Sequence, residues 1–486
     1  MSATLGVVGA GERSYWQERQ ETSSSPSHAL RPLEGALTVD YAVVGAGFSG
    51  LATAYFLKRA EPAARVVVLD AGRVGASGAS GRSAGLVTTG FGLSLSSTVK
   101  AFGGDRARQA HEYLEQGVEL VERLVKQNRI DCGYERNGLL RVATTPSWAR
   151  RVREEVVLAR ALGLHGIDWL DASAVREQVE SPLFLGAAWN ARAALVDPAR
   201  LAWGLRDVLE RAGVQLHEGT PALRIERRLG RLFVRTPRGS ILAEKLAIAT
   251  NAYSDPFPAL RRKQVALAAH AVVSEPLRAE QLKAIGWRGR QAIADARNLA
   301  RFYRLTPDGR LLIGGRGVGL SSGRLSSRIF ARLEDDARVL FPSLQRLRFP
   351  YRWSGLVSMP MQLIPALGHL GSERIVYSLG CMGQGIALAH MNGWTLADLL
   401  RGEKTERTSA FFVNRRVVPW PQGPLRLVLA LAMRTLLRAE DAWSERGLPQ
   451  VPKPPPLRLV PKDEEGSPGA RESSSAHRDS PRRSYR

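Results

Sequence analysis

The sequence predicts an α/β chain of two interleaved lobes, one of them Rossmann-like. Two observations indicate this fold. An apolar strand at 41–44 leads through the glycine loop Gly45–Gly50 into a helix at 51–60, whose apolar residues recur with helical spacing. A second buried strand at 65–69 then ends at Asp70. This is a strand-helix-strand unit, and 486 residues are enough for a second lobe beside it.

The rest of the chain is predicted to leave this lobe twice and to return each time. In the first excursion the pattern predicts helices over 98–128 and 148–162 with a strand at 138–143 between them, and a strand at 246–250 returns to the first lobe. The second excursion runs from 265 to 315. The chain then returns in a final strand, glycine turn and helix at 375–379, 380–385 and 386–401. The predicted organisation is a flexible leader (1–36), an enzyme body (37–448), and a disordered tail (449–486). In the body, the first lobe takes 37–95, 196–262 and 350–405, the second takes 96–195 and 263–349, and an amphipathic helical segment takes 405–448.

The formal charge of +23 raises the question of a nucleic-acid partner. Arginine is scattered through almost every segment, with no long basic run interleaved with aromatic residues. This distribution favours a solvated basic surface, so no specific nucleic-acid partner is expected. A basic surface also suits acidic substrates or membrane surfaces.

Compartment and membrane contact are predicted from the cysteines and the apolar stretches. Cys132 and Cys381 cannot build a disulfide framework and lack the spacing of a metal site, so we expect a reducing compartment, the cytoplasm, and no metal. The apolar stretch 425–437 contains Arg426 and Arg434 and is shorter than the ~20 residues of a spanning helix. It is predicted to be an amphipathic helix on the protein's own surface, with peripheral membrane contact as the alternative.

The glycine loop predicts a dinucleotide site. Gly45 permits a sharp turn, Gly47 lets a pyrophosphate approach the backbone, and Gly50 lets the helix pack closely on the strand. Asp70 lies 70 − 50 = 20 residues after Gly50, at a strand end where a carboxylate accepts hydrogen bonds from ribose hydroxyls. Strand, helix and carboxylate together make the motif far more specific than its glycines alone.

A second loop of small residues, 75–85, follows and carries Arg82. Such a loop lets backbone and hydroxyl groups approach a bulky cofactor, which favours FAD over NAD. With this loop the chain resembles the FAD-dependent D-amino-acid oxidase (DAO) superfamily, and within it the gamma-glutamylputrescine oxidase-like branch. Further matching motifs are Ser14-Tyr15-Trp16, Val196 to Leu201, Ala249 to Tyr253, Tyr303 to Arg310 and Trp353-Ser354-Gly355.

The resemblance implies a glutathione-reductase/DAO-type fold, in which FAD extends across the Rossmann-like lobe and substrate lies between the flavin and a large mixed sheet. It implies non-covalent FAD, with Cys381 a small buried thiol. The cofactor-binding residues that it implies are Gly45, Gly47 and Gly50 at the pyrophosphate, Asp70 at the ribose, Ser80 and Arg82 near the phosphates or flavin, Leu223 near the adenine, Ala249 and Asn251 beside the cofactor, and Gly383, Gln384 and Gly385 at the flavin ring.

Three positions depart from the family pattern. Gln384 stands where many members have a histidine, so it can donate a hydrogen bond but cannot titrate near neutral pH. Gln362 stands where an aspartate is usual. Val357 stands where amino-acid oxidases hold a carboxylate-binding arginine, so a simple amino-acid carboxylate would lack its fork-shaped partner. Candidate pocket residues are Tyr253, Tyr303, Arg304 and Arg316, with Gln384 as a further catalytic candidate.

The resemblance implies oxidation of a C–N bond in a small-molecule amine or amino-acid-derived substrate, by hydride transfer to the flavin, with O2 as the expected electron acceptor. The cofactor supplies most of this chemistry. Two alternatives stay open at this point. One is a dehydrogenase that passes electrons to a quinone or another carrier, and the other is a flavoprotein without turnover that serves as a binding partner.

Overall fold

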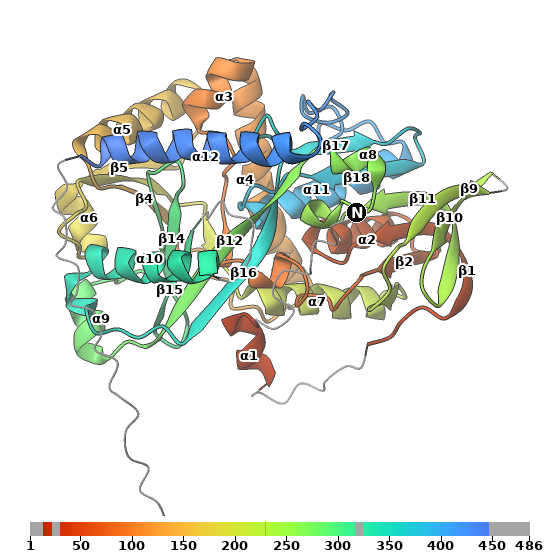
Figure 1. Ribbon diagram of the computed structural model, residues 1–486, viewed down its shortest axis with the longest axis horizontal. Helices are drawn as coiled ribbons and strands as arrows, with labels where there is room; N and C mark the ends of the chain where they lie inside the picture. The colour runs from red at the N-terminus through yellow and green to blue at the C-terminus, as the bar shows by residue number, and fades with distance from the viewer. Residues whose placement is uncertain (1–12, 22–29, 229, 316–323, 447–486) are drawn as a thin grey trace, which may run out of the picture. The chain divides into compact units, whose positions relative to one another are not determined.

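The computed structural model describes residues 13–21, 30–228, 230–315 and 324–446, which form two sheets of eight strands each with helices around them (Figure 1). The first sheet has the order β17-β18-β11-β1-β2-β8, with the hairpin β9-β10 attached to β11. Its strands are β1 (Gly35–Val44), β2 (Val66–Leu69), β8 (Gln215–His217), β9 (Arg224–Arg228), β10 (Arg231–Arg235), β11 (Gly239–Ile248), β17 (Ala366–His369) and β18 (Ile375–Leu379).

Four parallel strands of the first sheet, β1, β2, β11 and β18, end at one edge. β1 pairs in parallel with β2 and β11, and β11 pairs in parallel with β18. The carboxyl ends of these strands therefore deliver Gly45, Ala249 and Gly380 to the same place, which is where ligands bind in open α/β sheets. The sheet is covered by helices α2 (Phe48–Ala60), α4 (Gly104–Gln127), α7 (Pro198–Arg211) and α11 (Gly385–Arg401).

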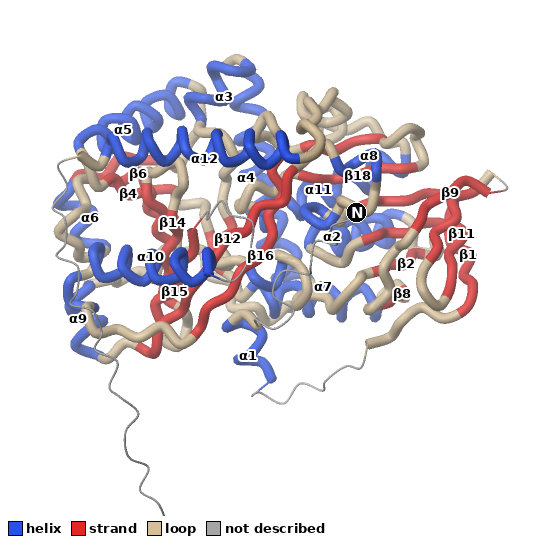
Figure 2. The backbone as a smooth tube through the Cα atoms, viewed as in Figure 1, coloured by secondary structure: helices blue, strands red, loops and turns tan. Residues whose placement is uncertain are grey.

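The second sheet has the order β16-β12-β15-β14-β13-β4-β6-β5 (Figure 2). Its strands are β4 (Leu139–Ala143), β5 (Ile167–Asp171), β6 (Gly186–Asn190), β12 (Val265–Pro276), β13 (Ala292–Asp295), β14 (Arg301–Leu305), β15 (Arg310–Gly315) and β16 (Tyr351–Met359). One face packs on α6 (Ala172–Gln178), α9 (Ala279–Ile285) and α10 (Arg324–Leu340) in a single apolar cluster. Strand β4 is parallel to β13 and antiparallel to β6, so the sheet is mixed.

The structure corrects the predicted boundary at 350. Strand β16 was expected in the first lobe, but it pairs with β12 over nine consecutive residue pairs, from Val265↔Met359 to Val273↔Tyr351. It therefore belongs to the second sheet. The helix predicted over 98–128 is also two helices, α3 (Leu95–Phe102) and α4, because Gly103 between them has φ 87° and cannot continue α3.

The predicted flexible leader contains a packed helix, α1 (Tyr15–Glu21), and this part of the prediction is wrong. Trp16 is fully buried and its indole N–H donates to Ser83 O at 2.9 Å. Ser14 Oγ donates to Gly81 O at 3.1 Å, and Gln17 Nε2 donates to Ala76 O at 2.9 Å. Helix α1 therefore braces the small-residue loop from the outside. Residues 35 and 36 of the predicted leader already belong to β1. Its residues 1–12 and 22–29, and the tail predicted at 449–486, lie outside the described residues.

The docking of α1 is expected to be acid-sensitive. Burial alone would raise the pKa of Asp308, but hydrogen bonds from Thr306, Tyr15 and Arg310 outweigh it and hold this pKa at about 2. Because that lies below the ordinary value of 3.8, the stabilisation is present above about pH 4 and is lost as the pH falls toward 2. The difference in melting temperature between the wild type and Asp308→Asn should therefore shrink over this range. A constant difference down to pH 2 would contradict the assignment.

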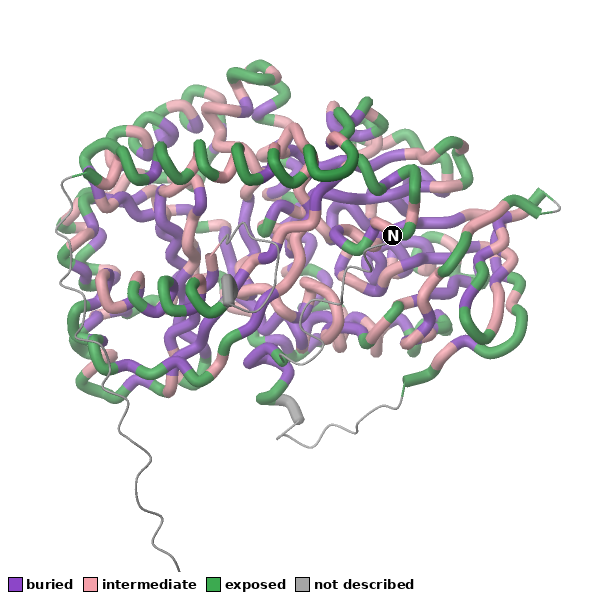
Figure 3. The backbone as a smooth tube through the Cα atoms, in the orientation of Figure 1, coloured by how far each residue is buried: buried purple, intermediate pink, exposed green. Residues whose placement is uncertain are grey.

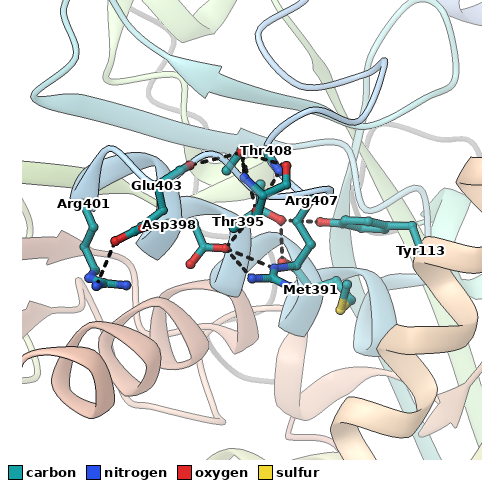
Figure 4. A network of polar contacts seen from close by, with 9 residues as sticks. Tyr113, Met391, Thr395, Asp398, Arg401, Glu403, Arg407 and Thr408 are labelled. Atoms are coloured by element: carbon teal, nitrogen blue, oxygen red, sulfur yellow. Dashed lines mark hydrogen bonds and ion pairs between the residues drawn. The ribbon is translucent and has the colours of Figure 1, made fainter.

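Helix α11 is anchored at its carboxyl-terminal half by a polar network (Figure 4). Tyr113 of α4 shares a hydrogen bond of 2.8 Å with Thr395, and Thr395 Oγ1 donates to Met391 O. Asp398 is buried and accepts from Arg407 at 2.6 Å and from Thr405 at 3.2 Å. These contacts fix the axis of α11, and with it the position of the amino terminus at Gly385.

The remaining segments are short, apart from α5 (Pro146–Ala161) and α12 (Pro424–Ser444). They are α8 (Pro258–Arg261), the pair β3 (Leu86–Val87) and β7 (Ala194–Leu195), and the 3-10 turns η1 (Ser80–Arg82), η2 (Asn251–Tyr253) and η3 (Pro342–Leu344). Helix α12 confirms the helix predicted around 425–437 and is largely exposed along its length (Figure 3). Among the described residues, no helix is both long and apolar enough to span a membrane.

Candidate active site

The glycine loop has the geometry that its sequence predicts. Gly45 has φ 103°, and a Cβ there would lie 2.8 Å from Ala249 O. A Cβ at Gly50 would overlap the carbonyl oxygen of Gly45. Gly45 thus takes a backbone conformation that other residues rarely adopt, and Gly50 gives the first turn of α2 room to lie against the loop.

The amino terminus of α2 is open to an anion. Its N-cap residue is Gly47, so the N-cap position itself has no side chain to occupy the N–H groups of the first turn. Phe48 N donates to Ser80 Oγ at 3.0 Å, which places the predicted residue Ser80 directly beside the loop. A helix start with free N–H groups and a positive dipole is a suitable site for a pyrophosphate.

Asp70 holds the loop from the neighbouring strand. Its Oδ2 accepts from Ala46 N at 2.7 Å, and its Oδ1 accepts from Gly72 N at 2.8 Å. Burial raises the pKa of Asp70, while the two N–H groups oppose that rise. The carboxylate therefore links the ends of β1 and β2 while lying at the strand end where a ribose is expected.

One cavity, which we call the cofactor cavity, connects this loop with the second sheet. It begins at Gly47, where α2 starts, and reaches the glycine turn at Gly383 and Gly385. Its other described lining residues include Ser80, Arg82, Ala249, Asn251, Phe302, Trp353, Gly355 and Val357. Seven of the predicted cofactor residues, namely Gly47, Ser80, Arg82, Ala249, Asn251, Gly383 and Gly385, thus line a single space.

Two polar residues stiffen the walls of the cofactor cavity. Arg82 donates from Nε to Ala76 O at 3.0 Å and from a terminal nitrogen to Ser354 O at 3.1 Å, joining the small-residue loop to β16. Asn251 has φ 44°, and its side-chain amide donates to Cys381 Sγ at 3.0 Å and accepts from Gly380 N at 3.2 Å. Cys381 is thereby held as a hydrogen-bond acceptor within the glycine turn.

Gln384 lies between the cofactor cavity and a second cavity beside it. Its backbone neighbours line the cofactor cavity, but its side chain lines a second cavity, where Oε1 accepts from Gly92 N at 3.3 Å. Gln384 precedes α11 without a side-chain cap, so the positive end of the α11 dipole lies at the cofactor cavity. Gln362 lies elsewhere, accepting from Val418 N at 3.3 Å.

The structure does not bring the predicted pocket residues together. Tyr303 is buried in the apolar cluster on the far face of the second sheet. Arg304 is 1 % exposed and donates to Ala84 O at 3.1 Å, so its guanidinium binds the small-residue loop 75–85 and not a substrate. Tyr253 is 37 % exposed and donates to Ser77 O at 3.4 Å. Neither these three side chains nor Leu223, which is 55 % exposed, lines either of the two cavities, and Arg316 lies outside the described residues.

Phe302 is a residue of the cofactor cavity that the sequence does not identify. On β14, Phe302 pairs with Gly314 and Tyr303 pairs with Ile313, so the two rings point to opposite faces of the sheet. Phe302 takes the face toward the cofactor cavity. Strand alternation places one of the two there, but the sequence alone does not say which face is which.

These residues fit FAD. The uncapped start of α2 suits the pyrophosphate, the glycines leave the wall of the cavity flat, and the second uncapped helix start at α11 favours negative charge on a reduced flavin. Gly45, Gly47, Gly50 and Ser80 would hold the pyrophosphate, and Gly383 and Gly385 would face the ring.

The chain matches the family model described as DAO, FAD dependent oxidoreductase, over residues 40–399. It is 31 % identical over 401 residues to gamma-glutamylputrescine oxidoreductase of Escherichia coli (strain K12), covering 80 % of this chain and 90 % of that one. It is 25 % identical to sarcosine oxidase subunit beta of Rhodobacter capsulatus, covering 77 % and 88 %. The crystal structure of glycine oxidase from Geobacillus kaustophilus superposes with a TM-score of 0.68 at 24 % identity, covering 79 % and 100 %.

The fold, the glycine loop with its carboxylate, and these matches agree, and the chain belongs to the DAO family of FAD-dependent oxidoreductases.

Proposed function

We propose that this FAD-dependent oxidoreductase oxidises the C–N bond of a small-molecule amine and passes the electrons to O2. The observation that carries the proposal is the apolar wall of the second sheet that faces the glycine turn, formed by Phe302, Trp353 and Val357. This wall can shield a neutral amine from water. Val357 offers no charge to an amino-acid carboxylate, which favours an amine over a simple amino acid.

Bound FAD supplies the hydride acceptor. The chain's own residues position the two reactants and exclude water, which is the larger part of what a protein contributes to such a reaction. The amino terminus of α11 provides the fixed positive potential, and the α4–α11 network keeps it in place. Both cysteines are free thiols, which supports the expected cytoplasmic placement.

A panel of amines tests the function. Purified enzyme is mixed with each amine under argon while the flavin absorbance is followed, and air is then admitted. Bleaching followed by rapid recovery in air is the result expected for an oxidase. Bleaching that air fails to reverse would favour the dehydrogenase with a quinone or other carrier, and no bleaching by any amine would overturn the proposed function.

Phe302 gives a matched test of the pocket. Phe302→Ala is expected to lower kcat/KM at least roughly tenfold, because a misplaced substrate loses its alignment with the flavin. The adjacent substitution Tyr303→Phe removes only a hydroxyl on the far face and should leave kcat/KM within about twofold. The reverse order of effects would show that Tyr303 faces the substrate.

A further inference from the structure

A second cavity of about 280 Å³ lies beside the cofactor cavity. Its roof comes from the segment 88–95, from α4 and from α5, and its floor comes from β4, β6, β13 and β14. Described residues with aliphatic or aromatic side chains make up much of the lining, including Phe91, Leu93, Leu139, Val152, Val156 and Ala188. The space is large enough for several non-hydrogen atoms of a ligand.

The two cavities share one sheet face and meet at Phe302. Phe302 lines both of them. Across the sheet, Phe302 pairs with Ala294, Ala294 with Arg141, and Arg141 with Ala188, so all four side chains point to the same face. Gln384 lines the second cavity while Gly383 and Gly385 line the first. A molecule whose amine reached the flavin would therefore extend past Phe302 and Gln384 into the second cavity.

The charged groups of the second cavity are already paired. Glu155 is 8 % exposed, forms an ion pair with Arg141 and accepts from Ser96 Oγ at 3.2 Å. Arg297 donates to Asp295 at 3.1 Å. Arg151 donates to Glu440 at 3.0 Å. Because these protein charges are already neutralised, a net charge on a ligand would be buried here without a partner, which costs free energy. A dipolar group, in contrast, can bond to both members of the Glu155–Arg141 pair.

We propose that the second cavity is the distal half of the substrate site and that it takes the far end of an elongated amine, an end that is dipolar and carries no net charge. This inference rests on the proposed amine oxidation. Glu155 accepts from the N–H of that distal group, Arg141 donates to its oxygen, and the aliphatic lining holds the spacer.

Four amines with a similar reacting end test the distal site: propylamine, putrescine, 4-aminobutanoate and N-acetylputrescine. N-acetylputrescine, whose far end is a neutral amide, is expected to show a kcat/KM at least tenfold above the other three. Equal kcat/KM for all four would overturn the distal site while leaving the proposed function intact. Failure of every amine to bleach the flavin would instead overturn the proposed function.

Charge variants make the test specific. Glu155→Gln leaves Arg141 unpaired and should shift the preference toward 4-aminobutanoate, and Arg141→Gln should shift it toward putrescine. The matched control is Glu154→Gln, one residue away on the exposed side of α5, which should keep the wild-type ranking. An unchanged ranking in both charge variants would overturn the assignment.

A cavity-filling variant tests the distal site independently of the charge variants at Glu155 and Arg141, should those fail to fold. Ala188→Leu adds volume to the floor of the second cavity. It should lower kcat/KM for N-acetylputrescine at least fivefold more than kcat/KM for propylamine, which is too short to reach the second cavity. Equal losses for both amines would overturn the distal site.

An independent feature is the exposed face of α12. Of the twelve large apolar side chains that are exposed among the described residues, six lie on this helix: Leu425, Leu427, Val428, Leu431, Leu436 and Trp443. The opposite face packs through Ala430 against Val265 and Trp420. The exposed face is therefore a second apolar surface, and the packing of the helix does not use it.

The charges around α12 are predominantly positive. Its acidic neighbours are engaged, since Glu440 pairs with Arg151 and Glu445 pairs with Arg297. Arg434 and Arg438 lie one turn apart on α12, and burial together with this nearby positive charge lowers the pKa of Arg438. Trp443 lies under the guanidinium of Arg446 at 3.9 Å. Apolar residues with tryptophan and flanking arginine match the headgroup boundary of an anionic membrane.

We infer that α12 docks this enzyme on an anionic phospholipid surface. The full chain is expected to sediment with vesicles containing phosphatidylglycerol, not with pure phosphatidylcholine, and to be released by salt. Leu436→Ser with Trp443→Ser should reduce the bound fraction at least fivefold, while Leu185→Ser, an exposed residue elsewhere, should not. Absence of vesicle binding, or concentration-dependent dimerisation that the double variant abolishes without vesicle binding, would overturn the inference.

Discussion

Gly50→Val is expected to yield protein with less than a tenth of the wild-type FAD content. A side chain at Gly50 would overlap the carbonyl oxygen of Gly45, which is backbone and cannot move aside without displacing the turn itself. The displaced turn would lose the hydrogen bond from Ala46 N to Asp70, and the start of α2 would no longer face the pyrophosphate. The loss is therefore one of cofactor affinity, ahead of any effect on chemistry.

The measurement is the flavin released per protein after denaturation, read by absorbance. Gly78→Val is the matched control, because Gly78 lies in the small-residue loop with nothing within 4 Å of an added Cβ and an ordinary φ. It should keep most of its FAD. Wild-type FAD content in Gly50→Val would show that the loop does not hold the cofactor.

Arg304→Met is expected to destabilise the protein by about 1–3 kcal/mol, the usual cost of leaving buried hydrogen-bond acceptors without a donor. Burial lowers the pKa of Arg304 to about 10, so the guanidinium is still charged at neutral pH. It donates to Ala84 O at 3.1 Å, to Gly85 O at 3.3 Å and to Val196 O at 2.7 Å. Methionine fills similar volume but leaves all three carbonyl oxygens without this donor.

Thermal unfolding in the presence of excess FAD measures this effect without interference from cofactor loss. Arg227→Met on the exposed hairpin strand β9 is the matched control and should change stability by less than about 0.5 kcal/mol. If the two variants melt at the same temperature, Arg304 does not connect the second sheet to the loop that it contacts.

The sequence predicts the Rossmann-like part well because each of its signals is local. The strand, the glycine loop, the helix and Asp70 lie within about thirty residues, and each has its own physical reason. Ala249 and Gly383 could be placed only through the family resemblance, because their position depends on parallel pairing between strands far apart in the chain.

The sequence predicts the second sheet less well, because which face a residue takes depends on partners that periodicity does not identify. Tyr303 and Phe302 are both aromatic and adjacent, and only the pairing with Gly314 and Ile313 decides which ring faces the cavity. β16 shows the same limit, since its partner β12 lies about eighty residues earlier. Helix α1 escaped prediction because its burial depends on residues far along the chain, among them Ser83, Asp308 and Tyr351.

The contact between Tyr15 and Asp308 spans 293 positions of the chain. During synthesis α1 emerges early, while its partner hairpin at 306–310 is made much later. The contact of Tyr15 with Asp308 can therefore form only after about three fifths of the chain has been made, since a long-range contact needs both partners. The contacts of α1 with Gly81 and Ser83 join residues that are made early, whereas its contact with Asp308 closes only once β14 of the second sheet has been made.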